Sequence, residues 1–224
     1  MNRVLVVSAH PDDETYGVGG TIISHVARGD AVFVLILTDG VTARHNEIEQ
    51  QKTAAEQACT RLGVTEVCFA RLPDQGLDGL PLLDVIRPIS GAIREFQPEI
   101  VYTHHRGDVN QDHRRVFEAT LVAVRPVGQN PVRRVLSYEV PSSTEWGPPC
   151  ADWVFTPNVF ENIAPFLDQK LAALAMYTQT HESEVKPFPH PRSLEAVRIY
   201  AQQRGVSVGM LAAEAFMLLR ELRI

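Results

Sequence analysis

Two short segments of the chain concentrate the residue types that hold metal ions and move protons. The first is AHPDDE at residues 9–14, and the second is HHRGDVNQDH at residues 104–113. The first segment gathers one imidazole and three carboxylates at the end of an apolar run, where burying them costs free energy unless a cation compensates. Imidazole and carboxylate both bind zinc, and a mixed set is more typical of catalytic than of structural zinc. A turn with an acidic helix N-cap is the alternative, but it explains neither His10 nor the second segment.

The second segment carries three histidines and two aspartates within ten residues. A lone histidine at the position of His113, which opens a predicted helix, would more often be a capping or core residue. Paired with the first segment, it indicates a metal site. Three protein ligands leave zinc a position for water, whose pKa then falls towards ~7. The spare carboxylate of Asp12 can act as a general base.

Apolar runs alternate with amphipathic stretches through residue 138. The predicted strands span residues 4–7, 31–37, 67–70, 100–103 and 135–138, and the predicted helices span 17–28, 46–62, 82–96 and 112–124. Asn46 is a plausible cap of the second helix, Gly63 ends it, and Pro88 is expected to kink or split the third. This alternation predicts an α/β fold: a Rossmann-like, doubly wound, mostly parallel sheet with helices on both faces.

Beyond residue 140 the pattern weakens. Residues 160–177 and 193–204 are expected to be helical, and residues 211–222 fit either a helix or a strand. We expect one domain, 1–224, with a core of about 1–140 and a C-terminal extension, 141–224, that covers the site.

Polar segments follow four of the predicted strands at their carboxyl ends. They are residues 10–13, 38–40, 72–74 and 104–113. Right-handed crossovers bring the carboxyl ends of parallel strands to one edge, where ligands bind in such sheets. We therefore expect these segments to form one site.

Composition excludes several classes of protein. The chain has 224 residues, 45% of them hydrophobic, a net charge of −6 and no basic block, so nucleic-acid binding has little electrostatic support. No apolar stretch approaches the ~18 residues that span a bilayer. The three cysteines are scattered, which is typical of free thiols in a reducing compartment. We expect a cytoplasmic protein without a membrane span.

The AHPDDE segment, together with Asp112 and His113 at the end of a Gly107-Asp108 loop, resembles the LmbE-like (PIG-L) zinc deacetylases. That family includes the deacetylases of mycothiol, bacillithiol and glycosylphosphatidylinositol biosynthesis. The resemblance covers roughly residues 1–140, including TDG at 38–40, LGV at 62–64 and LPD at 72–74. It implies a hydrolase that removes an N-acetyl group from an amino sugar, such as N-acetylglucosamine, or from a sugar conjugate.

The resemblance also implies roles for individual residues. His10, Asp13 and His113 match the metal ligands, and Asp12 matches the general base. Asp112 matches a residue that orients a histidine on the oxyanion side. One Zn²⁺ per chain is expected, replaceable by another divalent ion. Relatives are often homo-oligomers, so self-association is a further expectation.

One position departs from the family pattern. Many members carry a histidine three residues before the last ligand, where this chain has Asn110. Asparagine can donate a hydrogen bond to an oxyanion, but it cannot act as a cationic general acid. Either Asn110 performs a reduced role, or His104, His105 or His181 substitutes. His104 and His105 are also substrate-binding candidates. A branch of the family associated with bacterial surface polysaccharides is similar here, which favours a polysaccharide or nucleotide-sugar pathway.

Two substrate-binding candidates have simpler alternatives. Asp74 matches a residue that could bind sugar hydroxyls, but it is also an ordinary turn aspartate after Pro73. Lys52 lies near the place of a substrate-binding arginine in relatives. Arg44 competes for that role, and an exposed helix cation is the alternative for both.

Two rival functions come from other classes. A Rossmann-type nucleotide-binding protein would use the glycines of GVGG at 17–20, but a GxGxxG fingerprint requires glycine where Ile22 stands. Three carboxylates after the first strand would also repel a pyrophosphate. The other rival is a non-catalytic metal- or sugar-binding module, which would not need Asp12 beside the metal.

Overall fold

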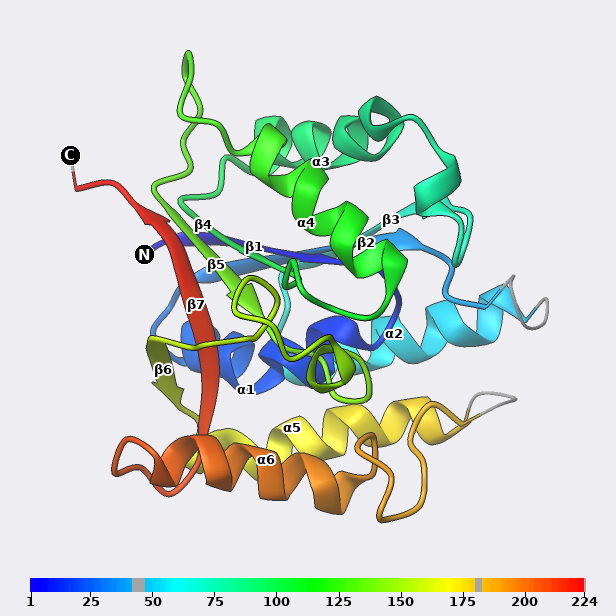
Figure 1. The fold of residues 1–224 in the computed structure, drawn as a ribbon, viewed down its shortest axis with the longest axis vertical. Coiled ribbons are helices and arrows are strands. Elements are labelled where there is room, and N and C mark those ends of the chain that lie inside the picture. The colour runs from blue at the N-terminus through cyan, green and yellow to red at the C-terminus, as the bar shows by residue number, and fades with distance from the viewer. Residues whose placement is uncertain (42–46, 180–182, 224) are drawn as a thin grey trace.

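The computed structural model describes residues 1–41, 47–179 and 183–223. Its strands join one sheet in the order β3-β2-β1-β4-β5-β7-β6 (Figure 1). Their bounds are β1 Arg3–Ser8, β2 Ala31–Thr38, β3 Glu66–Leu72, β4 Ile100–Thr103, β5 Arg134–Tyr138, β6 Val159–Asn162 and β7 Ala213–Glu221. Strands β1 to β5 pair in parallel, while β7 runs antiparallel to both β5 and β6. The α/β prediction with a mostly parallel sheet is confirmed.

Helices cover both faces of the sheet (Figure 1). They are α1 Asp13–Ala27, α2 Ile48–Leu62, α3 Leu82–Phe96, α4 Gln111–Ala123, α5 Leu167–Leu174 and α6 Leu194–Val206, and the short 3-10 helices are η1 Leu77–Gly79, η2 Thr144–Trp146, η3 Ala164–Phe166 and η4 Ala175–Gln179. Alternate side chains of β1 enter two cores. Val4 and Val6 pack with α1, α2 and α5, whereas Leu5 and Val7 pack with α3 and α4. Burial on both faces explains the continuous apolar runs of the parallel strands.

The five predicted strands and the four helices before residue 140 are present, with small shifts at their ends. Helix α1 begins at Asp13 rather than at residue 17, and α3 is continuous through Pro88. The buried face of α3, which includes Val85, Ile89 and Phe96, packs against the sheet and holds the helix through the proline. Gly63 ends α2 in the left-handed region, with φ of 82°. The proposed cap Asn46 lies outside the described residues.

The segment after residue 140 differs more from the prediction. The expected helix at 160–177 is wrong in its first part, where β6 forms, and its α-helical part is only α5. The undecided segment 211–222 contains strand β7, which pairs with β5 and β6. Pairing with distant strands, rather than local periodicity, decides both segments. In the part of the chain that the structure describes, no helix has the length and apolarity needed to cross a membrane.

Candidate active site

A cavity of about 380 Å³ lies at the carboxyl ends of β1 and β4. Its polar wall includes His10, Asp12, Asp13, Asp74, Gln75, Asn110, Ser142, Ser143, His113, Glu184 and Arg192. The AHPDDE and HHRGDVNQDH segments therefore meet, although they are about 100 residues apart in the sequence. The parallel pairing of β1 with β4 brings them together.

Three buried side chains converge on one point of this wall. Nδ1 of His10 lies 3.2 Å from Oδ2 of Asp13, and Nε2 of His113 lies 3.3 Å from the same oxygen. The two imidazole nitrogens are 3.2 Å apart. Zinc ligands at their usual bond lengths are roughly 3.3 Å from one another in a tetrahedral shell. The donor types and their spacing therefore fit a single zinc ion.

Each of these imidazoles has a carboxylate on its other nitrogen. Nε2 of His10 lies 3.2 Å from Oδ2 of Asp112, and Nδ1 of His113 lies 3.0 Å from Oδ2 of Asp108. An ionised carboxylate only accepts hydrogen bonds, so these nitrogens carry the hydrogen and the nitrogens near Asp13 are left as potential ligands. Such carboxylate–histidine pairs orient metal ligands.

Asp112 and Asp74 form a second group with His10 that has metal-ligand chemistry. Asp112 already accepts backbone hydrogen bonds from Gln75, at 2.8 Å, and from Leu77, at 3.0 Å. Oδ1 of Asp74 lies 3.5 Å from Nε2 of His10. Asp74 and Asp112 both lie near Nε2 of His10, the nitrogen that carries the hydrogen. They are therefore placed to orient His10 rather than to bind a second ion with it.

The charges of the site favour a cation. Burial lowers the pKa of His113, but Asp108 and Asp13 outweigh it and raise the pKa to about 10. Burial likewise opposes the hydrogen bonds of His10 to Asp112 and Asp13, which together raise its pKa to about 9. The imidazoles also hold the pKa of Asp13 well below its usual range, against the effect of burial. These carboxylates thus favour protonated, positively charged imidazoles. A bound divalent ion would supply that positive charge in place of the protons.

Asp12 stands beside this group, in a strained backbone conformation. Its φ is 109°, in the left-handed region, and helix α1 begins at the next residue. The backbone N–H of Asp12 donates to Oε2 of Glu14 at 3.0 Å, which holds the turn in place. Glu14 is itself fully buried and accepts from Tyr177 at 2.8 Å. Strain at a non-glycine residue persists only where its surroundings impose it, and it is concentrated at functional sites.

Arg192 binds the carboxylate of Asp12 and was not anticipated from the sequence. Its guanidinium also lies 3.7 Å from Glu184 and 4.6 Å from the centre of the Tyr16 ring. The sequence around Arg192 has no motif that indicates a role in the site, because its partner, Asp12, lies near the other end of the chain. Gln75, Ser143 and Trp146 also line the cavity without having been predicted.

Two of the predicted substrate-binding histidines lie away from the cavity wall. Nε2 of His104 accepts the backbone N–H of Ala9 at 2.9 Å, and its ring stacks on His113 with centroids 3.9 Å apart. His105 instead donates to the carbonyl of Trp153 at 2.8 Å. His104 thus packs behind the metal-ligand group, and His105 is directed towards a neighbouring loop.

The remaining predicted residues are divided between the cavity and other surfaces. Asn110 lines the cavity and caps α4, its Oδ1 accepting from the backbone of Asp112 at 2.9 Å. Asp74 also lines the cavity. Lys52 lies in a separate hollow, 3.6 Å from Glu56 and over the ring of Phe69. Arg44 and His181 are outside the described residues.

Solved structures with the same fold include proteins of more than one activity. The conserved protein TT1542 from Thermus thermophilus is 26% identical, with a TM-score of 0.80 over 100% of this chain and 97% of that one. The N,N'-diacetylchitobiose deacetylase from Pyrococcus horikoshii is 21% identical, with a TM-score of 0.77 over 98% and 84%. The 4-carboxy-2-hydroxymuconate hydratase GalB from Pseudomonas putida KT2440 is 23% identical, with a TM-score of 0.78 over 100% and 98%. The last two likenesses concern the fold alone.

Sequence comparison is more specific. Residues 5–124 match the family model PIG-L, described as GlcNAc-PI de-N-acetylase. The uncharacterized deacetylase YaiS of Escherichia coli K12 is 31% identical over 184 residues, which are 76% of this chain and 88% of that protein. A probable N-acetyl-alpha-D-glucosaminyl L-malate deacetylase 2 of Bacillus anthracis is 25% identical over 81% of each chain. The match spans more than half of the chain and includes both segments of the site, and the chain belongs to the PIG-L, or LmbE-like, family of deacetylases.

Proposed function

We propose that the protein is a zinc-dependent hydrolase that removes the N-acetyl group from an amino sugar or sugar conjugate. The observation that carries this proposal is the convergence of His10, Asp13 and His113 on the cavity wall, with the carboxylate of Asp12 beside them. The name of the Bacillus anthracis relative, a probable N-acetyl-alpha-D-glucosaminyl L-malate deacetylase 2, supports the substrate class.

His10, Asp13 and His113 would hold the ion, and Asp108 and Asp112 would orient the two histidines. The ion would polarise the acetamide carbonyl and make water acidic near neutral pH. Asp12 accepts the proton of the attacking water and then passes it to the departing amine.

Asn110 and Asp74 complete the proposed site. Because the Oδ1 atom of Asn110 accepts a hydrogen bond from the backbone of Asp112, its amide N–H groups are left to donate to the oxyanion that develops on the substrate. Asp74 is placed on the cavity wall, where its carboxylate can bind a sugar hydroxyl. Lys52, His104 and His105 do not line the cavity, so we assign them no contact with the substrate.

We also propose that residues 1–224 act as one catalytic domain. The segment 141–224 provides Ser143, Trp146, Glu184 and Arg192 to the cavity wall and inserts β7 beside β5. The site is thus built from both parts of the chain.

The rival functions find less support in the local packing. A Cβ added at Gly17 would lie 2.3 Å from the ring of Tyr138, and one at Gly20 would lie 2.7 Å from Ile163. These glycines let α1 pack closely against its neighbours, which accounts for them without a nucleotide. A binding module would not need a carboxylate beside the metal-ligand group that can accept a proton from water, the role proposed for Asp12.

The test is a deacetylation assay on protein of verified zinc content. A panel of acetamido sugars, free and nucleotide-linked, is incubated with the enzyme, and acetate and free amine are both measured. We expect equal amounts of the two products and none after zinc removal. Full zinc occupancy without turnover of any acetamide would contradict the proposal and favour a binding module. Nucleotide binding without zinc would favour the Rossmann-type rival.

A further inference from the structure

An exposed tryptophan stands on the wall of the cavity. The side chain of Trp146 is 56% exposed, and Val109, also on the wall, is 46% exposed. Large apolar side chains in solvent are informative when they gather at a concave site, since pockets combine apolar walls with a few polar groups. Neither side chain belongs to the proposed metal-ligand group.

The turn that carries Trp146 is tied to the proposed metal site. Within η2, Thr144 donates its hydroxyl to Oδ2 of Asp108 at 2.8 Å, and Ser143 donates to the other oxygen of the same carboxylate. On the other side of the tryptophan, a Cβ added at Gly147 would lie 2.2 Å from the carbonyl oxygen of Gly107. Trp146 is therefore fixed to the loop that orients His113.

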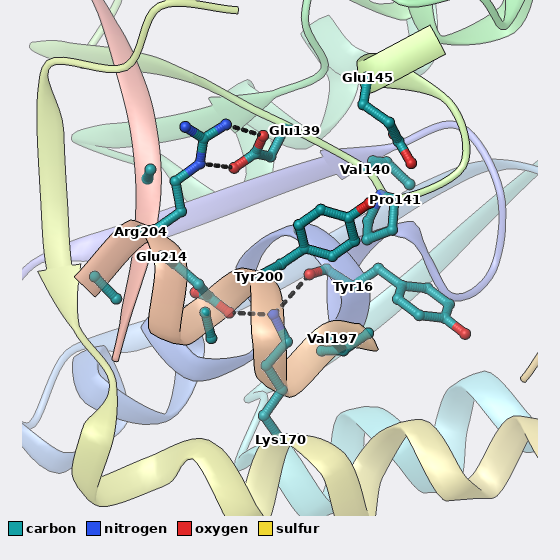
Figure 2. Close-up of a pocket in the computed structure, with 14 residues that line it drawn as sticks. Tyr16, Glu139, Val140, Pro141, Glu145, Lys170, Val197, Tyr200, Arg204 and Glu214 are labelled. Carbon is teal, nitrogen blue, oxygen red and sulfur yellow. Dashed lines mark hydrogen bonds and ion pairs between the residues drawn. The ribbon is translucent and has the colours of Figure 1, made fainter. Parts of the chain in front are cut away.

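Helix α6 packs near the same turn. A small pocket of about 50 Å³ lies between this helix and the segment 139–145. Figure 2 shows the side chains that line it. Arg204 binds both carboxylate oxygens of Glu139, at 2.7 and 2.6 Å (Figure 2). Glu145 accepts the backbone N–H groups of Ser142 and Ser143, at 2.6 and 3.1 Å. The indole thus stands on a turn anchored from both sides, as a pre-organised binding surface requires.

We propose that Trp146 forms a subsite for the pyranose ring of the N-acetylated substrate. This inference rests on the proposed function and adds to it a residue that binds the sugar ring. The face of an indole carries negative charge density, and the C–H groups on one face of a pyranose carry a slight positive charge, so the two attract when stacked. The hydroxyl groups at the sugar's rim remain available to Asp74 and Asn110.

The test uses a neutral probe, methyl N-acetylglucosaminide, which we expect the wild-type enzyme to hydrolyse. In Trp146→Ala, KM for the neutral probe should rise roughly tenfold with kcat nearly unchanged, because stacking with an aromatic ring contributes binding free energy of that order. Trp146→Phe should retain most of the affinity.

Trp153→Ala is the matched control, because it removes the chain's other tryptophan, which does not line the cavity. Its KM should equal that of the wild type. If the wild type is active and Trp146→Ala keeps the wild-type KM, the subsite is wrong while the proposed function stands.

A binding measurement keeps the inference testable without turnover. In zinc-loaded Asp12→Asn, Trp153→Phe protein, Trp146 is the one remaining tryptophan, and titration with the neutral probe should change its emission. If no acetamide is hydrolysed by the wild type but this change occurs, the proposed function fails and the subsite is retained. An unchanged emission at saturating probe would overturn the subsite, and this readout also serves if Trp146→Ala does not fold.

Discussion

Arg192 donates to the carboxylate of Asp12, an ion pair between residues 180 positions apart in the chain. It joins the C-terminal segment to the AHPDDE motif at the edge of the cavity. The guanidinium lies on the ring of Tyr16, whose hydroxyl in turn donates to the carbonyl of Arg192 at 2.9 Å. Arg192 is thus held at both its backbone and its side chain, and it fixes the direction of the proposed general base.

Removing this cation should impair turnover without removing the metal. In Arg192→Met, Asp12 and Glu184 lose their shared partner, and Asp12 is free to turn away from the substrate. We expect kcat to fall on the order of 100-fold, because small displacements of a catalytic group have effects of that size. Zinc content should equal that of the wild type, because Arg192 lies outside the ligand group. Steady-state kinetics and elemental analysis measure both quantities.

Arg198→Met is the control for this substitution. Arg198 pairs with Asp168 at 2.6 Å on an exposed surface, where ion pairs contribute little. The kcat of the Arg198→Met enzyme should match that of the wild type. An Arg192→Met enzyme with unchanged kcat would show that Asp12 does not need this partner.

The two adjacent aspartates should respond differently to the same substitution. Asp12→Asn should keep zinc but lose turnover by a factor on the order of 100 or more, because the amide cannot accept the proton of water. Asp13→Asn should lose zinc itself, because it removes one of the three proposed ligands, the carboxylate that lies 3.2 and 3.3 Å from His10 and His113. Asp78→Asn, an exposed aspartate of η1, is the neutral control. Near wild-type turnover by zinc-loaded Asp12→Asn would place the base elsewhere.

The sequence was sufficient to predict the parallel part of the fold and the meeting of the two polar segments at one edge of the sheet. Strands β1 to β5 have their own apolar runs, and their parallel order brings residues 9–14 and 104–113 to one edge. Strands β6 and β7 could not be predicted in the same way, because β7 is defined by antiparallel pairing with β5. Local periodicity carries no information on such long-range partners.

The same distinction explains which site residues were missed. Arg192 has no local motif, and its role comes only from its contact with Asp12. His104 was a candidate for binding the substrate or replacing the oxyanion-side histidine, but its ring is fully buried and accepts the N–H of Ala9. Residue type and spacing indicated the chemistry of the segment, whereas side-chain direction required the packed structure.

The carboxylates behind the ligand histidines should determine metal affinity. Asp108→Asn and Asp112→Asn should each weaken zinc binding about 10–100-fold, because losing the carboxylate frees the imidazole to rotate and lowers its basicity. His113→Ala should retain far less than the one equivalent expected of the wild type. Competition with a chelator measures the affinities. Wild-type affinity in both aspartate variants would contradict the orienting role derived from the 3.2 and 3.0 Å contacts.

A buried ion pair in the small pocket of Figure 2 should be important for stability. Lys170 donates to Glu214 at 2.6 Å and to the carbonyl of Tyr16 at the same distance (Figure 2). Glu214 accepts the backbone N–H groups of Gly20 and Thr21, at 2.8 and 2.7 Å. Lys170→Met leaves the buried carboxylate without its cation, and we expect a loss of about 3–5 kcal/mol in urea unfolding. The Lys170→Met, Glu214→Gln double variant should be destabilised less than the two single losses combined, and simple additivity would contradict a direct coupling.

His25 should make stability depend on pH. Burial lowers its pKa below 6.5, outweighing the hydrogen bond from its Nδ1 to Asp30 at 2.8 Å. The unfolded chain therefore takes up a proton below about pH 6.5 that the folded protein resists, and stability falls as the pH falls through that value. Asp30 has a lowered pKa, so its own contribution is lost only in more acidic solution, below its usual value of 3.8. His25→Asn can still donate to Asp30 but does not titrate. Urea unfolding at pH 8 and pH 5.5 should show a larger drop in the wild type than in this variant, with the other buried histidines common to both. Equal drops would mean that His25 is protonated as easily in the folded protein as in the unfolded chain.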